Sequence, residues 1–341
     1  MYIVQTEKIT QLRKRLMKAG KVVITSHVHP DGDAVGSATA MLSFLTEHLG
    51  KKAVVVFPDE VPAHLRFIVP EGLQGRVRWG VEAATDVLKE ADLLLALDFN
   101  EFSRTEDLRT YFQDFKGPRI LIDHHVGPDT AAFDLVFSET GISSTCELLY
   151  WILTAMSGTG SLPAACKDAL LTGMTTDTNN FANSVFPTTL EMASELLSAG
   201  VDRDRILENL YWKGRENRLR LLGHLLSEKL TITPEGAAIM ILRAADRDRF
   251  GILEGETEGF VNMPLTIGKV RISAFFKEED GILRVSLRSK KPLSSRALAV
   301  KAFHGGGHEL AAGGKVLVPE DIPTLDAAPD YLAGIFKDYL Q

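Results

Sequence analysis

Four places in the chain put aspartate and histidine side chains where they could bind a metal ion. These places are His27-Val-His-Pro-Asp31-Gly-Asp33, Asp98 after Leu-Leu-Leu-Ala-Leu, the triplet Asp123-His124-His125, and Asp177 in Thr-Gly-Met-Thr-Thr-Asp. The first three follow strand-like runs, and the fourth follows an apolar helix that is expected from residue 163. Ligands of an open parallel sheet bind at the edge where its strands end. We therefore expect the four places to converge on one edge of a sheet.

A metal centre explains this convergence better than helix capping does. An aspartate at the end of a strand is often the N-cap of the next helix, and capping accounts for any one of the four places alone. Several carboxylates gathered at one edge repel one another and are tolerated when a cation neutralises them. Carboxylate oxygens with a few imidazoles suit Mn²⁺ or Mg²⁺, and the lack of a cysteine ligand argues against structural zinc.

The elements that must position these residues alternate between strands and helices. Strands are predicted at 21–25, 53–57, 93–97 and 119–122, and helices at 35–49, 143–157 and 163–173. The runs at 93–97 and 119–122 are apolar throughout, which is typical of strands covered on both faces. The fold class predicted for the first half is therefore α/β, with a doubly wound parallel sheet.

A second, smaller α/β domain is predicted in the last third of the chain. Before it, an arginine-rich helical stretch from about 188 to 227, interrupted near Gly200, is interpreted as a solvated connection. Strands at 237–243, 270–276 and 282–288 and a helix at 294–303 are then expected. The predicted boundaries are 1–190 for the catalytic domain, 191–225 for the helical linker and 226–341 for the substrate-binding domain.

Composition and charge exclude several classes of protein. The 341 residues are 45% hydrophobic and 24% charged, which excludes a disordered or collagen-like chain. A net charge of −7 argues against binding to long duplex nucleic acid, but it allows short nucleotides as substrates. Between residues 281 and 305 the chain carries six cations and no acid. A positive stretch of this kind suggests a cleft for an anion.

The cysteines and the apolar runs bear on location. Two cysteines, Cys146 and Cys166, cannot build a disulfide framework and are expected to be buried thiols. No signal peptide is predicted at the start of the chain. The apolar runs are far shorter than the ~20 residues that span a bilayer. We therefore expect a cytoplasmic protein that does not contact a membrane.

The ordered motifs resemble those of the DHH phosphoesterases. His-x-x-x-Asp-x-Asp, the strand-end Asp98, Asp-His-His and a later Gly-x-x-x-Asp match the four motifs of that family. The segment Gly305-Gly-Gly-His308-Glu-Leu-Ala-Ala-Gly313 matches the signature of its DHHA1 domain. Together the motifs cover residues 27 to 313. Within the family, the sequence is most similar to the stand-alone nanoRNase and 3′-phosphoadenosine 5′-phosphate (pAp) phosphatase type.

This resemblance implies a centre of two Mn²⁺ ions, with Mg²⁺ or Co²⁺ as substitutes. By resemblance, the first ion is held by His27, Asp31 and Asp98, and the second by Asp33, Asp98, His124 and Asp177. Asp98 bridges the two ions, and His125 points towards the scissile phosphate or supports the ligands. A hydroxide activated between the ions then attacks phosphorus in line. His29 matches no ligand position, so its role is left open.

The resemblance also implies that the second domain binds the substrate. The implied substrate-binding residues are Ser286, Arg288, Ser289, Gly305, Gly306, Gly307 and His308. Arg288 is the best candidate for a bidentate phosphate clamp, with an ordinary surface arginine as the alternative. Strand alternation places Ser286 on the face of Arg288 and Ser289 on the other face. The glycines allow backbone N–H groups to approach a phosphate, although a plain glycine turn is the simpler explanation of these residues alone.

The function implied is that of a Mn²⁺-dependent phosphodiesterase and phosphatase. It would hydrolyse short single-stranded oligoribonucleotides to mononucleotides and pAp to AMP and phosphate. A homodimer is left open. Hydrolysis of cyclic di-AMP or pApA is the close alternative, and pyrophosphate or polyphosphate hydrolysis is less favoured. A silent nucleotide-binding module is the non-enzymatic alternative, but it predicts degraded ligands, and here every ligand position is filled.

Overall fold

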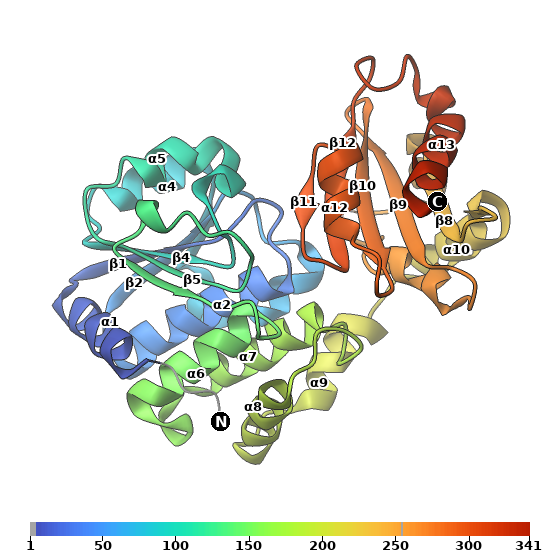
Figure 1. The fold of residues 1–341 in the computed structure, drawn as a ribbon. Coiled ribbons are helices and arrows are strands. Elements are labelled where there is room, and N and C mark those ends of the chain that lie inside the picture. Colours follow the sequence, from blue (N-terminus) through green and yellow to red (C-terminus); the bar gives the residue numbers. More distant parts are fainter. Residues whose placement is uncertain (1–4, 254) are drawn as a thin grey trace. The chain divides into compact units, whose positions relative to one another are not determined.

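The computed structural model describes residues 5–253 and 255–341, and it divides the chain into two compact units. These units are residues 1–213 and 214–341. Both units contain helices and a sheet (Figure 1), and each sheet has six strands. No helix within the described residues is long and apolar enough to cross a membrane. The α/β fold class expected from the sequence is confirmed.

The sheet of the N-terminal unit is parallel throughout. Its strands are β1 (Lys21–Thr25), β2 (Lys52–Phe57), β3 (Val77–Trp79), β4 (Leu93–Leu97), β5 (Arg119–Asp123) and β6 (Leu135–Ser138). Their order is β3-β2-β1-β4-β5-β6, and every pairing between neighbours is parallel. The order of the strands reverses between β1 and β4, and such a switch point is where doubly wound sheets bind their ligands.

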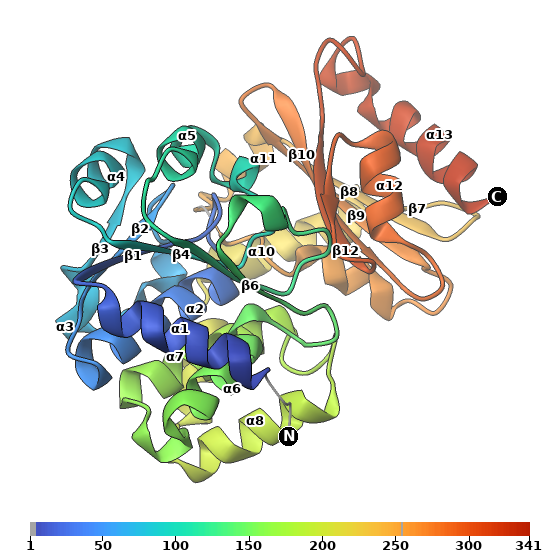
Figure 2. The ribbon, with the colours of Figure 1, turned by 60° about the vertical axis from the view of Figure 1, so that its left-hand side comes forward.

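Helices cover both faces of this sheet. They are α1 (Thr6–Lys18), α2 (Gly32–Ser43), α3 (Glu71–Gln74), α4 (Gly80–Leu88), α5 (Arg109–Gln113), α6 (Thr145–Ser157), α7 (Ala164–Asp177), α8 (Pro187–Ser198) and α9 (Arg203–Leu207). In the views of Figures 1 and 2, α1, α2, α6 and α7 lie on one side of the sheet, and α4 and α5 lie on the other. Two separate apolar clusters fill these layers.

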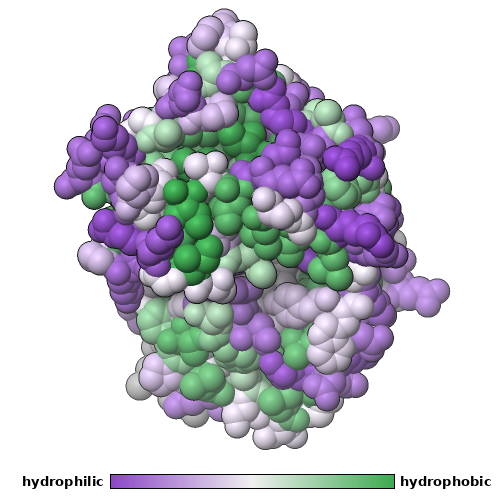
Figure 3. Space-filling model, turned by 90° about the vertical axis from the view of Figure 1, so that its right-hand side faces the viewer, coloured by the Kyte–Doolittle hydropathy of each residue, from purple (hydrophilic) through white to green (hydrophobic). Residues whose placement is uncertain are grey.

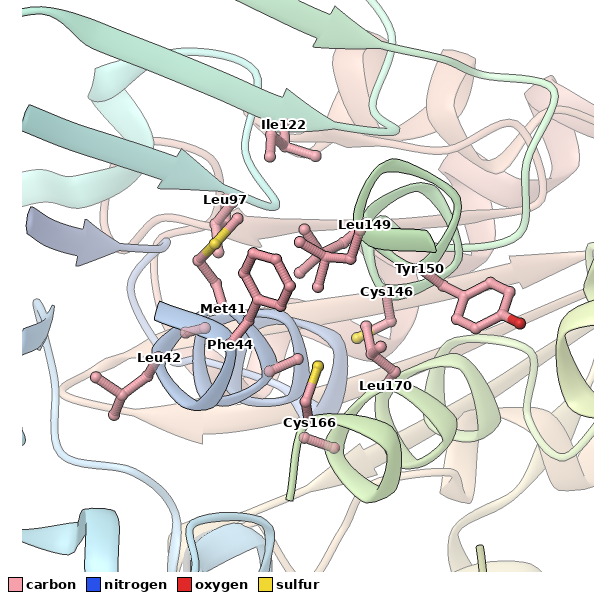
Figure 4. Close-up of a cluster of buried hydrophobic side chains, with 14 of the residues drawn as sticks. Met41, Leu42, Phe44, Leu97, Ile122, Cys146, Leu149, Tyr150, Cys166 and Leu170 are labelled. Carbon is pink, nitrogen blue, oxygen red and sulfur yellow. The ribbon is translucent and has the colours of Figure 1, made fainter. Parts of the chain in front are cut away.

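The residues of β4 explain why its sequence is apolar throughout. Leu93, Leu95 and Leu97 belong to the cluster between the sheet and α2, α6 and α7, whereas Leu94 and Ala96 belong to the cluster between the sheet and α4 and α5. All five side chains are buried. Figure 4 shows part of the first cluster, in which side chains from α2, α6 and α7 meet beneath the strands. A strand buried on both faces cannot alternate between apolar and polar residues.

Helices α2 and α7 pack closely because glycines stand at their contact. A Cβ atom on Gly173 of α7 would lie 2.3 Å from Cys146 Sγ and 3.0 Å from Gly32 O. A Cβ atom on Gly36 of α2 would lie 2.8 Å from Ala169 O. Neither position has room for a side chain unless a helix moves. This contact holds the start of α2 against the end of α7.

The C-terminal unit contains a mixed sheet. Its strands are β7 (Thr231–Ile232), β8 (Ala237–Leu242), β9 (Ile272–Glu279), β10 (Ile282–Ser289), β11 (Gly306–Gly307) and β12 (Ala311–Val316). Their order is β11-β12-β10-β9-β8-β7. Strands β8 and β9 pair in parallel, and the other pairs are antiparallel. The strands expected at 237–243, 270–276 and 282–288 are therefore confirmed, with ends shifted by a few residues.

Four α-helices of the C-terminal unit accompany this sheet: α10 (Glu216–His224), α11 (Ala244–Arg249), α12 (Ser295–Ala302) and α13 (Ala328–Leu340). Side chains of α12 and α13 pack on one face of the sheet, and those of α10 pack on the other. The helical stretch expected from 188 to 227 is divided among α8, α9 and α10 and short π-helical turns. Gly200, with φ at +88°, stands at the break after α8.

Some large apolar side chains remain exposed on the C-terminal unit. Leu219, Leu253, Met263 and Val300 are the exposed large apolar residues of its described part. On the face drawn in Figure 3, apolar residues gather between hydrophilic ones. Apolar atoms make up more than half of the accessible surface of folded proteins, so these side chains alone assign no function.

The close contact of α2 and α7 leads to a stability prediction. Gly173→Ala is expected to lower the free energy of unfolding by about 1–3 kcal/mol, because the new methyl group overpacks the contacts with Gly32 O of α2 and with Cys146 of the neighbouring α6. Urea unfolding followed by circular dichroism measures this change. Gly72→Ala is the matched control, since a Cβ atom there has no neighbour within 4 Å. Equal stability of the two variants would show that the contact has room to relax.

Candidate active site

The ends of β1, β4 and β5 bring the expected residues to one edge of the parallel sheet. The loop after β1 carries His27 and Asp31, Asp98 follows β4, and the Asp123 triplet begins at the end of β5. Because β4 lies between β1 and β5, these three loops are neighbours. Asp177 joins them from the last turn of α7 rather than from a strand.

Two groups of possible ligand atoms at this edge contain the expected ligands, and a third group joins Asp98 to Asp123 and His125. His27, Asp31 and Asp98 form the first group, whose atoms all lie within 4.8 Å of one another. In it, His27 Nε2 is 3.5 Å from Asp98 Oδ2 and 3.9 Å from Asp31 Oδ1. Asp33, His124 and Asp177 form the second group under the same limit. These are the six residues that the family resemblance implies as ligands.

Asp98 stands between the two groups. Its Oδ2 atom faces His27, and its Oδ1 atom is 3.6 Å from His124 Nε2. His124 Nε2 in turn is 3.6 Å from Asp177 Oδ2 and 3.9 Å from Asp33 Oδ2. One carboxylate therefore presents a different oxygen to each group, which is the arrangement that a bridging ligand needs.

Local structure explains how Asp31 and Asp98 reach these positions. Asp31 is the N-cap of α2, and its Oδ1 atom accepts hydrogen bonds from the N–H groups of Asp33 and Ala34. Asp31 therefore both caps α2 and belongs to the first group of possible ligands. Asp98 has a φ of +64°, and aspartate is among the few residues that adopt this left-handed conformation readily. Its N–H donates to Ile122 O of β5.

Burial sets the charges of the carboxylates. Desolvation, followed by the charge of Asp177, raises the pKa of Asp33 to about 6. Desolvation and the charge of Asp33 raise the pKa of Asp98 well above its ordinary value. Among the described residues, no lysine or arginine forms an ion pair with Asp33 or Asp98. Buried carboxylates that repel one another without a partner cation are a fit for a bound metal ion.

The imidazoles complement these carboxylates. Burial lowers the pKa of His27 to about 4, although the charge of Asp31 acts in the opposite direction. Burial and the neighbouring His125 also lower the pKa of His124. Both rings are therefore neutral near pH 7, and a neutral imidazole has the lone pair that a metal ligand requires. The donor set of carboxylates and neutral imidazoles fits a hard or borderline divalent cation.

His125 is oriented by the aspartate of its own triplet. His125 Nδ1 lies 2.7 Å from Asp123 Oδ1, so in the neutral ring Nδ1 donates and Nε2 is the acceptor nitrogen. Burial acts to raise the pKa of Asp123, but the hydrogen bond and charge of His125 lower it overall. The ring lies close to the possible metal ligands, since Nδ1 is also 3.8 Å from Asp98 Oδ1.

His29 lies outside both groups. Its N–H donates to Asp59 Oδ2 at 2.6 Å, and its Nδ1 atom lies 3.6 Å from the same oxygen. Asp59 follows β2, so this contact joins the loops after β1 and β2. More than half of the His29 side chain is exposed. The structure thus gives His29 a contact between loops and no place among the possible ligands.

In the C-terminal unit, strand β10 carries the expected substrate-binding residues. Ser286 and Arg288 are half-buried on one face of the sheet, whereas Ser289 is buried on the other. The Ser289 hydroxyl donates to Leu293 O and accepts from the Ser295 hydroxyl. The hydroxyl of Ser289 is therefore hydrogen-bonded inside the C-terminal unit. Ser286 and Arg288 lie on the opposite face, as strand alternation predicts.

The glycines of the Gly-Gly-Gly-His segment have different surroundings. A Cβ atom on Gly305 would lie 1.9 Å from Gly313 O, and one on Gly307 would lie 2.8 Å from Ala311 O. These two glycines are required because β11 and β12 approach closely. Gly306 has no neighbour within 4 Å of such an atom. His308, next along the chain, donates its N–H to Ala311 O at 2.7 Å.

Two residues at the site were missed by sequence reasoning. The N–H groups of Thr145 and Cys146, at the start of α6, donate to the two oxygens of Asp33. The available signal was the pattern Ser144-Thr-Cys-Glu147, which is typical of a helix N-terminus. Ser144 does cap α6, since its hydroxyl accepts from the N–H of Glu147. The start of this helix is aimed at the candidate metal site.

The carboxylates and imidazoles clustered at the edge of the parallel sheet define a candidate metal centre. Comparison with known families gives two matches. The model of the DHH family, N-terminal domain, matches residues 21–174, and the model of the DHHA1 domain matches residues 237–333. The chain belongs to the DHH family and carries a DHHA1 domain.

Individual relatives agree with this assignment. The crystal structure of an exopolyphosphatase-related protein from Bacteroides fragilis has a TM-score of 0.91 and 31% identity, over 100% of this chain and 98% of that one. The bifunctional oligoribonuclease and PAP phosphatase NrnA of Bacillus subtilis is 26% identical over 90% of this chain and 93% of its own. The cyclic-di-AMP phosphodiesterase GdpP of Geobacillus thermodenitrificans is 25% identical over 97% of this chain but 49% of its own.

The repulsion at Asp98 leads to a prediction for the metal-free protein. Because the pKa of Asp98 is raised in the folded state, stability is lost as the pH rises through that folded-state pKa. Asp98→Asn removes this charge and keeps the shape of the side chain. In EDTA at pH 8 the variant is expected to be more stable than the wild type by at least about 1 kcal/mol.

Thermal unfolding with and without Mn²⁺ measures both halves of this prediction. Added Mn²⁺ should raise the Tm of the wild type, because a ligand that binds only the folded state stabilises it. The Tm of Asp98→Asn should change little. A variant that is less stable than the wild type in EDTA would contradict the account of repulsion between buried carboxylates.

Proposed function

We propose that this protein is a Mn²⁺-dependent phosphoesterase that acts on short nucleotides. It hydrolyses short oligoribonucleotides to mononucleotides, and pAp to AMP and phosphate. The observation that carries the proposal is the position of Asp98, whose two oxygens face two separate carboxylate–imidazole groups. Two cations that share one carboxylate can stabilise the attacking and the leaving oxygen of a phosphate together.

The proposed ligands divide as the two groups do. His27, Asp31 and Asp98 would hold one ion, and Asp33, Asp98, His124 and Asp177 would hold the other. Manganese suits this mixture of carboxylate oxygens and neutral imidazoles. When bound, the two ions supply positive charge that polarises the phosphate and acidifies water at the site.

The protein's own side chains supply position and proton exchange. Hydrolysis forms a bond from a water oxygen to phosphorus and breaks the bond to the leaving oxygen, which takes up a proton. His125 is held by Asp123 with Nδ1 as donor, so Nε2 is the nitrogen that exchanges a proton or accepts a hydrogen bond at the reacting group. Arg288 is proposed to bind a phosphate of the substrate, because guanidinium groups pair with phosphate in bidentate geometry.

Short nucleotides are the substrate class that the relatives and the charge both favour. The Bacillus subtilis relative, whose name states oligoribonuclease and PAP phosphatase activities, aligns over nearly all of its own length. The net charge of −7 suits a substrate with few phosphates, since a long polymer requires many cations. Cyclic di-AMP or its linear product is the second candidate, because the chain also matches about half of a cyclic-di-AMP phosphodiesterase.

A panel of substrates tests the proposed function. The purified protein with Mn²⁺ is offered pAp, a 5′-labelled RNA dinucleotide, cyclic di-AMP and pyrophosphate, and products are resolved by chromatography. We expect the highest kcat/KM on pAp and on the dinucleotide. Asp98→Ala should reduce both activities by at least about 10³-fold, because both metal positions lose a ligand. Preferential turnover of cyclic di-AMP or pyrophosphate would show that the proposed substrate class is wrong. A folded protein that turns over none of the four substrates would refute the proposal that it is an enzyme.

Arg288 is tested by its effect on substrate binding. Arg288→Ala is expected to raise KM for pAp by about 10–100-fold with a smaller change in kcat, since a charge-assisted hydrogen bond contributes about 1.5–3 kcal/mol. Arg284→Ala is the matched control, because Arg284 lies two pleats away on the same face of β10 and pairs with Glu279. If both variants keep the wild-type KM, Arg288 is an ordinary surface arginine.

A further inference from the structure

Thr145 touches two carboxylates that come from different elements. Its backbone N–H donates to Asp33 Oδ2 at 2.6 Å, and its hydroxyl donates to Asp98 Oδ1 at 3.0 Å. Asp33 belongs to the first turn of α2, whereas Asp98 follows β4. Thr145 is itself the first residue of α6 and is fully buried. One residue, through its backbone N–H and its hydroxyl, therefore ties three elements together at the candidate metal site.

The hydroxyl bond sets the direction of the Asp98 carboxylate. It binds Oδ1, the oxygen that faces His124, and leaves Oδ2 turned towards His27. Within the described residues, the Thr145 hydroxyl is the hydrogen-bond donor to the carboxylate of Asp98. The nitrogens of His27, His124 and His125 lie farther away, at 3.5 Å or more. Rotation of the carboxylate would remove one oxygen from each group. A neutral hydroxyl holds it without supplying the charge that a metal ion supplies.

The segment that carries Thr145 is itself fixed. The buried carboxylate of Glu147 accepts hydrogen bonds from the N–H and the hydroxyl of Ser143, and from the hydroxyl of Thr189 in α8. Ser144 caps the helix between them. Threonine adds a branched Cβ atom, which limits the rotation of its side chain. The position of the hydroxyl is therefore set before any ligand binds.

We propose that Thr145 is a positioning residue that orients the shared carboxylate of Asp98 and fixes its distance from Asp33, so that two metal ions bind at once. This inference rests on the proposed metal centre. Thr145 acts through its neighbours and is assigned no contact with substrate. Hydrogen-bonded partners behind metal ligands typically change metal affinity by about 10–100-fold when they are removed.

The test is the Mn²⁺ affinity of the full chain. It is measured by titration, with the electron paramagnetic resonance signal of free Mn²⁺ as the readout. Thr145→Val keeps the shape and the backbone N–H but lacks the hydroxyl, and we expect its Mn²⁺ affinity to fall about 10–100-fold. Thr145→Ser keeps the hydroxyl and should stay within about threefold of the wild type. Should Thr145→Val not fold, Thr145→Ala makes the same test.

Thr172→Val is the matched control. Thr172 is buried in α7, and its hydroxyl donates to Asp168 O, away from both groups of possible ligands. Wild-type Mn²⁺ affinity in Thr145→Val would overturn the role of Thr145 while the metal centre stands. An equal loss in Thr145→Val, Thr145→Ser and Thr172→Val would overturn it as a general packing effect. A wild-type protein that binds no Mn²⁺ would overturn the metal centre itself and the inference with it.

Discussion

The repulsion among buried carboxylates is the constraint on which this site depends. Asp33 and Asp98 are both buried, and desolvation raises the pKa of each, helped by the charge of Asp177 at Asp33 and by the charge of Asp33 at Asp98. A fold keeps such an arrangement when a ligand of opposite charge compensates it. Binding of a divalent cation would relieve this repulsion.

The rest of the N-terminal unit holds these charges in place against their repulsion. The parallel sheet brings the loops after β1, β4 and β5 to one edge, and close packing of α2 against α7 brings Asp33 and Asp177 to the same edge. The start of α6 then donates N–H groups to Asp33 and a hydroxyl to Asp98. Helix N-termini favour negative charge, so this helix offsets part of the repulsion even without metal.

Much of this could be predicted from the sequence because the signals are local. The runs at 21–25 and 93–97 predict strands, and the rule that ligands gather at strand ends then predicts that Asp31 and Asp98 approach each other. The short strands β3 and β7 escaped prediction because two or three residues carry no period. The role of Thr145 escaped because it depends on contacts with residues 47 and 112 positions away. Such contacts follow from packing, which no local pattern records.

In the proposed site, one carboxylate, that of Asp98, serves two metal positions. A crystal of the protein grown with Mn²⁺ and measured for anomalous scattering tests it most directly. We expect two manganese peaks about 3.5–4 Å apart, with one oxygen of Asp98 bound to each. A single peak, or two peaks of which Asp98 contacts only one, would contradict it.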